Sequence, residues 1–266
     1  MTTIRLRTLF KKEVLDLSRN RAALLPVVLV ALISLALPFI VAVIVPAITG
    51  QSLGDDTDLM KVSLVAGIHP ELSADGRIQL FLFEQFLLVF LLMPITGAMA
   101  LAAHAVVGEK QARTLEPLLA TPISTFELLV AKVLGALVPT LTISTAALAA
   151  YFGCVALFAE PGVAGAMISI RTALLVALVG PAAALVSLQA AIVISSRVND
   201  ARTAQQFGVL IIIPLTAVFV AQFMGALWLS ATAIGVLGLG LFGAWILLTL
   251  VSVTLFQREV ILTKWR

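Results

Sequence analysis

The chain has 266 residues, of which 61% are hydrophobic and only 12% are charged, with a formal net charge of +3. A soluble domain of this size carries roughly a quarter charged residues, so an internal core cannot bury this much apolar surface and the lipid bilayer must act as the solvent. The single cysteine, Cys154, excludes an intrachain disulfide, and the two histidines, His69 and His104, leave few ligands for zinc or haem.

Residues 4–20 alternate apolar and charged side chains at helical spacing, which predicts an amphipathic helix lying in the cytoplasmic membrane interface. The alternative is an ordinary basic flank of the first membrane helix, and the two interpretations are compatible. The apolar run that follows is much longer than a signal-peptide core of about 7–15 residues. We therefore expect the first span to be retained as an anchor.

Uncharged apolar runs along the chain predict the membrane spans. The last run, residues 204–257, would form a helix about 75 Å long against a hydrocarbon core of ~30 Å, so it must turn, and Gly225–Thr232 (GALWLSAT) is the expected turn. The prediction is an all-α integral membrane protein with one transmembrane domain over residues 1–266. Its six spans are residues 23–46, 81–104, 131–153, 172–195, 207–226 and 232–256.

Basic residues indicate the orientation of these spans. If the N-terminus is cytoplasmic, the outer segments hold only Lys61, Arg77 and Arg171, and the other fourteen of the 17 Lys and Arg residues lie inside. This predicts a multi-pass protein of the plasma (inner) membrane with both termini in the cytoplasm. The outer loop at about residues 47–80 is too short for a domain with its own core, and Val62–Ile68 is a candidate interfacial segment.

A polar segment, Gly108–Pro139, separates the second span from the third. Glu109–Leu119 can form a short helix with leucines on one face and charges on the other. Thr121-Pro122 then breaks the chain, and Ser124–Glu127 has the capping-box spacing that starts the next helix. This pattern predicts a rigid helix–break–helix on the cytoplasmic face. It is either a docking surface for a second protein or a loop packed against its own helix ends.

The sequence GEKQARTLEPLLATPIS within this segment resembles a motif of ABC-2 type membrane permeases, in which a Thr-Leu-Glu-x-Leu-Leu core and a Thr-Pro break precede a helix with a lysine, here Lys132. The start KKEVLDLSRNRAALLP also resembles the family, through Lys12, Glu13, Arg19, Arg21 and Pro26. The similarity extends to the sodium- and drug-export branch. It implies a membrane part built with a second permease copy or paralogue, and a dimer of cytoplasmic ABC ATPase subunits that bind ATP and Mg. The implied coupling helix between spans 2 and 3 would contact the ATPase through Glu109, Lys110, Arg113, Thr114, Leu115, Glu116, Leu118 and Leu119.

Polar side chains within the spans are candidates for a transport path. They are Thr140, Thr142, Ser144, Gln189, Gln222 and Glu84. Hydroxyls in membrane helices also bond the carbonyl one turn back, and amides also join helices, so both roles stay open. We expect Glu84 to reach the headgroups, with Arg77 or Arg171 as a partner. Six prolines are expected to kink their helices: Pro26, Pro38, Pro94, Pro139, Pro181 and Pro214.

The pattern favours the permease subunit of an ATP-driven exporter over three alternatives. The chain contains no G-x-x-x-x-G-K-[ST] phosphate loop, so we expect no catalysis, cofactor or metal in it, and nothing suggests a nucleic-acid partner. An ion-gradient-driven transporter would need several buried carboxylates, and an intramembrane protease would need a motif such as H-E-x-x-H or a serine–histidine pair. A non-transporting membrane scaffold stays open. Hydroxyls and amides without a charge cluster favour lipophilic, amphipathic or neutral cargo.

Overall fold

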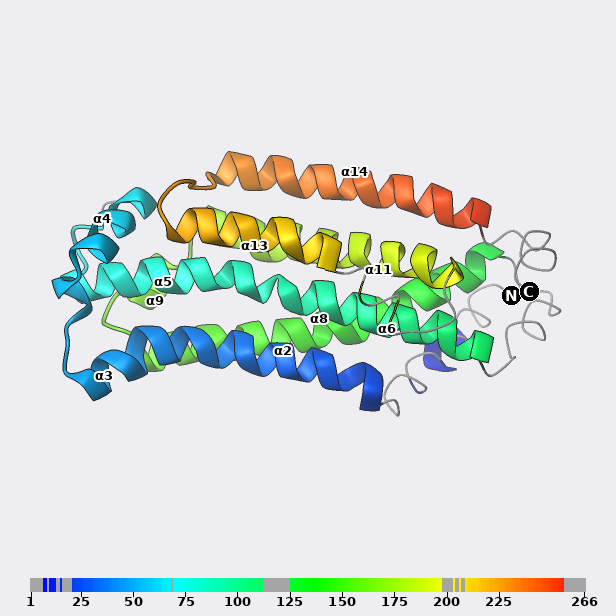
Figure 1. Ribbon diagram of the computed structural model, residues 1–266, viewed down its shortest axis with the longest axis horizontal. Helices are drawn as coiled ribbons and strands as arrows, with labels where there is room; N and C mark the ends of the chain where they lie inside the picture. Colours follow the sequence, from blue (N-terminus) through cyan, green and yellow to red (C-terminus); the bar gives the residue numbers. More distant parts are fainter. Residues whose placement is uncertain are drawn as a thin grey trace.

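The computed structural model describes residues 7–8, 10–12, 15, 21–67, 69–111, 125–197, 203, 206 and 209–255. Within these residues all regular secondary structure is helical. Figure 1 shows the long helices running side by side in one elongated bundle, with short helices gathered at one end. The long helices are α2 (Arg21–Phe39), α5 (Ala74–Phe90), α6 (Leu92–Gln111), α8 (Thr125–Phe158), α11 (Gly180–Arg197), α13 (Val209–Phe223) and α14 (Ala231–Leu255). The shorter ones are α3 (Val45–Thr49), α4 (Thr57–Ala66), α9 (Val163–Ala166) and α10 (Ile170–Leu174), with π-helices η1 (Ile40–Ile44) and η3 (Leu175–Val179) and the 3₁₀-helix η2 (Leu53–Asp55).

In the described part, five helical stretches are long and apolar enough to cross a membrane. They are Leu24–Thr49, Ala74–His104, Val130–Phe158, Ile170–Ser195 and Ala231–Val253. The predicted span 207–226 corresponds to the 15-residue helix α13, which rises roughly 22 Å and is short of a ~30 Å hydrocarbon core. A sixth crossing therefore stays a prediction. The expected turn lies where α13 ends at Phe223 and α14 begins at Ala231, with Gly225 at φ 70° in the left-handed region that suits glycine.

The predicted outer loop is more regular than its sequence suggested. The Asp56 carboxylate caps α4 by accepting the N–H groups of Asp58 and Leu59 at 2.9 and 3.0 Å. Ser73 Oγ accepts the Gly76 N–H at 2.9 Å, so α5 begins at Ala74 rather than near residue 81. The earlier start places Glu84 almost three turns into the helix instead of at its edge.

Three of the six prolines coincide with breaks in regular α-helix. Pro94 lies just after Leu91, where α5 and α6 meet, and it offers no N–H to the carbonyl of Phe90. Pro181 follows η3, whose wider i→i+5 bonding accommodates the missing donor; here Gly180 N–H bonds the Leu175 carbonyl. Pro38 lies in the last turn of α2, two residues before η1 begins at Ile40. The other three, Pro26, Pro139 and Pro214, lie inside continuous helices.

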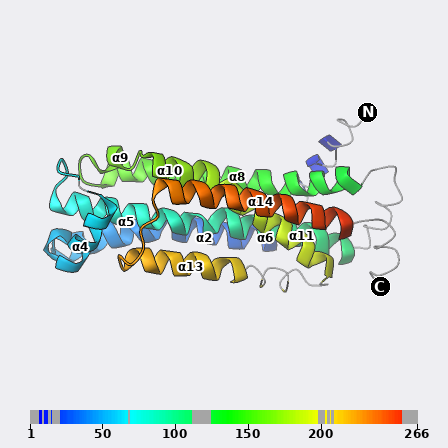
Figure 2. The same ribbon diagram turned by 90° about the horizontal axis from the view of Figure 1, so that it is seen from above.

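The α5–α6 rod forms the centre of the bundle. Its most apolar window is 83% buried, against 11% for the windows of α8 and α14. Helices α2, α8 and α11 pack around α6, and α14 packs on α11 and η3. Helix α13 packs mainly on α5 within the described part, and Figure 2 shows it on the side of the bundle opposite α8. The predicted interfacial helix 4–20 lies largely outside the described residues.

Candidate functional site

The predicted coupling segment lies mostly beyond the described residues. The backbone of Glu109 and Lys110 forms the last turn of α6, which continues to Gln111 without a break after the second span. Helix α8 begins at Thr125, directly after the expected Ser124 cap. The other predicted contact residues, Arg113, Thr114, Leu115, Glu116, Leu118 and Leu119, fall in residues 112–124, outside the described part, so this surface stays a prediction.

A buried ion pair joins three elements near the α4 end of the bundle. Arg171 Nη1 on α10 donates to Glu84 Oε2 on α5 at 2.7 Å. Arg171 Nε donates to the Leu229 carbonyl at 3.0 Å, and its guanidinium carbon lies 3.9 Å from the centre of the Trp228 ring. The side chains of Arg171 and Glu84 are only 14% and 9% exposed. The expectation that Glu84 reaches the headgroups is therefore wrong, because the early start of α5 puts it inside the bundle beside Arg171.

Two further polar side chains anchor α5, and the sequence analysis did not single them out. Gln79 donates to the Ala42 carbonyl at 3.2 Å and accepts the Glu160 N–H at 2.8 Å. The fully buried Tyr151 donates its hydroxyl to the Phe83 carbonyl at 2.8 Å. Tyr151 is the only tyrosine in the chain, and a lone phenol inside an apolar span was the signal that could have identified it. These contacts hold α5 against α8 and the α9 region.

The candidate path residues of α8 separate into two kinds. Thr140 and Thr142 donate to the carbonyls of Ala136 and Val138 one turn back, each at 2.8 Å. Thr142 is exposed on the bundle surface, while Thr140 is buried. These bonds favour the local hydrogen-bonding role for both threonines. Ser144 differs, because its buried Oγ has no hydrogen-bond partner among the described residues.

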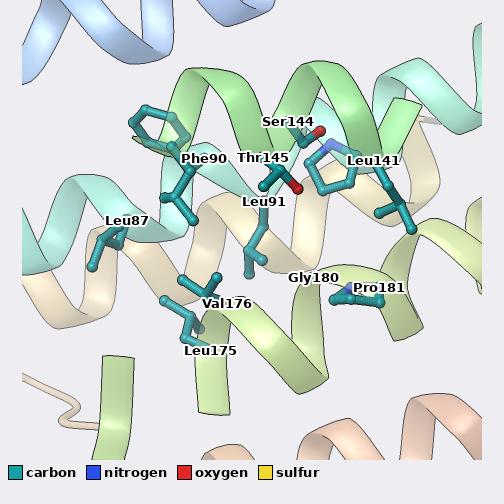
Figure 3. Close-up of a pocket in the computed structure, with 12 residues that line it drawn as sticks. Leu87, Phe90, Leu91, Leu141, Ser144, Thr145, Leu175, Val176, Gly180 and Pro181 are labelled. Carbon is teal, nitrogen blue, oxygen red and sulfur yellow. The ribbon is translucent and has the colours of Figure 1, made fainter. Parts of the chain in front are cut away.

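Ser144 borders a small cavity where the helix irregularities meet. The cavity has a volume of about 80 Å³ and is lined partly by Leu91, Thr145, Gly180 and Pro181 (Figure 3). Figure 3 shows Ser144 and Thr145 on one side of it and Gly180 and Pro181 on the other. A space of this size with hydroxyls on its wall can hold water. Of the predicted path residues in α8, only Ser144 lines this cavity.

A larger cavity, called here the cavity behind α13, lies between α13 and the helices η3, α11 and α14. It has a volume of about 720 Å³, and its walls come from α5, α6, η3, α11, α13, α14 and the turn before α14. Among the described residues that line it, Thr232 alone has a polar side chain; typical apolar members are Leu88, Leu175 and Val218. The cavity is therefore suited to hydrocarbon rather than to an ion or a sugar.

Two glutamines near this cavity are buried without partners. Gln85 on α5 and Gln222 on α13 are each 0% exposed, and neither the oxygen nor the nitrogen of either amide has a hydrogen-bond partner in the described part. Gln222 was a predicted path residue, and Gln85 was missed although it is an amide in the same kind of apolar setting. Gln189, also predicted, is 1% exposed on α11. An unpaired buried amide is costly, so Gln85 and Gln222 need an explanation.

A comparison with protein families decides between the candidate classes. The model of the ABC-2 family transporter proteins matches residues 7–242, which covers most of the chain. The chain belongs to this family. No curated protein matches it significantly. This ABC-2 protein is thus a multi-pass membrane subunit of an ABC transporter, which confirms the family predicted from the motif, while its assignment to the sodium- and drug-export branch stays a prediction.

The described residues of this ABC-2 protein offer no group of three or more His, Cys, Asp or Glu side chains placed to hold a metal ion. Its buried charges near the α4 end, Glu84 and Arg171, bond each other. What the arrangement offers instead is an apolar cavity, unpaired amides and an ion pair that joins helices. These features suit ligand binding and movement between helices.

Proposed function

We propose that the chain is the membrane-spanning permease subunit of an ATP-driven exporter. It would couple ATP hydrolysis by a separate cytoplasmic ATPase dimer to the export or translocation of a substrate. The observation that carries the proposal is the family match over residues 7–242, which spans the N-terminal region and the helical bundle. Because the sequence contains no phosphate-loop motif, ATP and Mg would be bound by the partner.

The contact with the ATPase is assigned to the segment between α6 and α8. Helix α6 ends and helix α8 begins at the end of the bundle opposite α4 (Figure 1). The distribution of Lys and Arg supports a cytoplasmic location for that end, with both termini on the same side of the plasma membrane. Leucines and charges between Glu109 and Leu119 would then dock into a groove of the ATPase.

The central rod supplies a path for movement from the ATPase to the far end. Helices α5 and α6 together cover residues 74–111, roughly 57 Å of helix, interrupted only at Leu91. A tilt of the α6 end would be passed through this rod to Glu84 and its partner Arg171. Nucleotide-bound and empty ATPase must stabilise different tilts for the rod to switch, since a partner shifts an equilibrium only by its differential affinity.

Reconstitution with the ATPase tests the proposal. The gene should lie beside one that encodes a phosphate-loop ATPase, and the two proteins should co-purify after co-expression. Glu109→Lys and Glu116→Lys should abolish co-purification and stimulated ATP hydrolysis without affecting membrane insertion. Lys61→Glu, a charge reversal on the exposed surface of α4, is the control and should leave both intact. Unchanged ATPase binding and activity in the two glutamate variants would show that the segment is an ordinary loop.

A further inference from the structure

The cavity behind α13 opens toward the surface of the bundle between α13 and α14. Val236 and Leu237, which line it from α14, are 71% and 45% exposed. In a membrane this opening faces hydrocarbon, so a ligand can enter laterally from the bilayer. Its volume of about 720 Å³ lies within the range of about 300–1,000 Å³ typical of pockets that bury a small molecule.

On three helices, a polar side chain lies one helical turn beyond the apolar lining, toward the α4 end. On α5, Gln85 precedes the lining residue Leu88 by three positions; on α13, Gln222 follows Val218 by four. Residues three or four apart share one face of a helix. Arg171 precedes the lining residue Leu175 by four positions in the same way. Polar side chains therefore lie beyond the end of the apolar lining that is nearest α4.

The two glutamines lie within one helical turn of each other along the α5–α13 interface. Two ring contacts fix the register of these helices: Phe81 with Phe223 at 6.2 Å and Phe86 with Phe219 at 6.0 Å between centroids. Gln85 falls between Phe81 and Phe86 on α5, and Gln222 falls between Phe219 and Phe223 on α13. Both amides are fully buried, and their nitrogen and oxygen atoms have no hydrogen-bond partner among the described residues. This part of the interface therefore holds two donors and two acceptors that are left unsatisfied.

The charged neighbours indicate which kind of polar group belongs there. Arg171 already bonds Glu84, the Leu229 carbonyl and the Trp228 ring, so its charge is balanced within the protein. A carboxylate or phosphate beside the two amides would be buried without a counter-ion, which is costly. A neutral group that both donates and accepts hydrogen bonds matches two amides.

We propose that this cavity binds an uncharged amphiphile of the monoacylglycerol type, with its hydrocarbon chain behind α13 and its hydroxyl-bearing head bonded by Gln85 and Gln222. Binding at this site requires no ATPase. The inference can therefore be tested on the chain alone, and its outcome is separate from that of the exporter assignment.

Quenching of Trp228 fluorescence by brominated lipids tests the proposal in nanodiscs. Trp228 precedes the lining residue Leu229, and Trp245→Phe with Trp265→Phe makes it the sole tryptophan. At equal mole fraction, a brominated monoacylglycerol should quench more strongly than phosphatidylcholine or a free fatty acid with the same brominated chain. Equal quenching by all three would show contact with bulk lipid only, and preference for the fatty acid would overturn the neutral head; either result refutes the proposal without any cavity variant.

Matched variants then locate the site. Ala233→Phe fills the cavity and should remove the preference for the monoacylglycerol, whereas Ala217→Phe on the exposed face of α13 should not. Gln85→Leu and Gln222→Leu should each weaken monoacylglycerol binding roughly two- to twelvefold, the loss expected for one or so hydrogen bonds. Binding of the matching methyl ester, which has no hydroxyl to donate, should change less. Equal loss for Ala233→Phe and Ala217→Phe, or unchanged binding in both leucine variants, would place the lipid elsewhere and overturn the assignment.

Discussion

Removal of Arg171 is the sharpest perturbation of the bundle. In Arg171→Met the Glu84 carboxylate, 9% exposed, loses its bonding partner at 2.7 Å and stays in an apolar setting. Breaking a buried ion pair in this way typically costs about 3–5 kcal/mol, because the remaining charge is uncompensated. Both side chains are shielded from solvent, so the discount that applies to surface pairs is not needed. The free energy of unfolding should fall by that amount.

Removing both charges should be much milder than removing one. In the double variant Glu84→Leu/Arg171→Met, the losses that persist are the hydrogen bond to the Leu229 carbonyl, ~1 kcal/mol, and the contact over Trp228, about 0.5–2 kcal/mol. The double variant should therefore lose about 1.5–3 kcal/mol, less than either single variant. This strong non-additivity is the signature of a coupled buried pair.

The assay is reversible unfolding of the purified protein in mixed detergent micelles, followed by circular dichroism, over the complete double-mutant cycle. The exposed pair of Lys61 and Asp58, with side chains 74% and 88% exposed, is the control, and Lys61→Met should have no measurable effect. If the double variant loses as much as the two single variants combined, Glu84 and Arg171 do not act as a pair and the reasoning fails.

Two further predictions concern packing and the unpaired amides. Gly238→Ala should destabilise the protein by about 1–3 kcal/mol, since a Cβ there would lie 2.5 Å from Leu178 Cγ. Gly240→Ala is the matched control: a Cβ there would have nothing within 4 Å, so this variant should be neutral or stabilising by up to ~1 kcal/mol. Thermal unfolding of both variants checks this. Gln85→Leu and Gln222→Leu should each stabilise the ligand-free protein by about 1–2 kcal/mol, because each removes an unsatisfied buried amide. The measurement is unfolding in lipid-depleted detergent. A clear loss of stability there would mean that the amides have a protein partner.

Five of the six spans and the family could be predicted because both depend on local sequence. A charge-free apolar run defines a membrane helix with little help from the rest of the chain, and the Thr-Leu-Glu-x-Leu-Leu motif is read directly. The start of α5 was the main boundary error. Asp75 and Arg77 look like loop residues to a search for uncharged runs, yet the Ser73 cap places them in the first turn of the helix.

The candidate site was predictable only in part. Sequence marked Glu84 and offered Arg77 or Arg171 as partners, but the choice depended on the α10 helix reaching α5. Gln222 was marked as an amide in an apolar span, and Gln85 was overlooked beside the more conspicuous glutamate. The cavity behind α13 had no sequence signal, because its volume depends on how far α13 stands from η3 and α14.

The positions of the two cavities connect the helix irregularities with the proposed movement. Leu91, at the break between α5 and α6, and Leu175, the first residue of η3, line both the small and the large cavity. Regular helices on both sides of these points are stiff, so any bending of the rod as it tilts is concentrated at Leu91, where Pro94 has already removed a backbone bond. A bend there changes the walls of both cavities at once. A ligand in this cavity that binds one tilt of α6 more tightly than the other would therefore bias that tilt, and by linkage the ATPase contact would change the affinity for the ligand by the same factor.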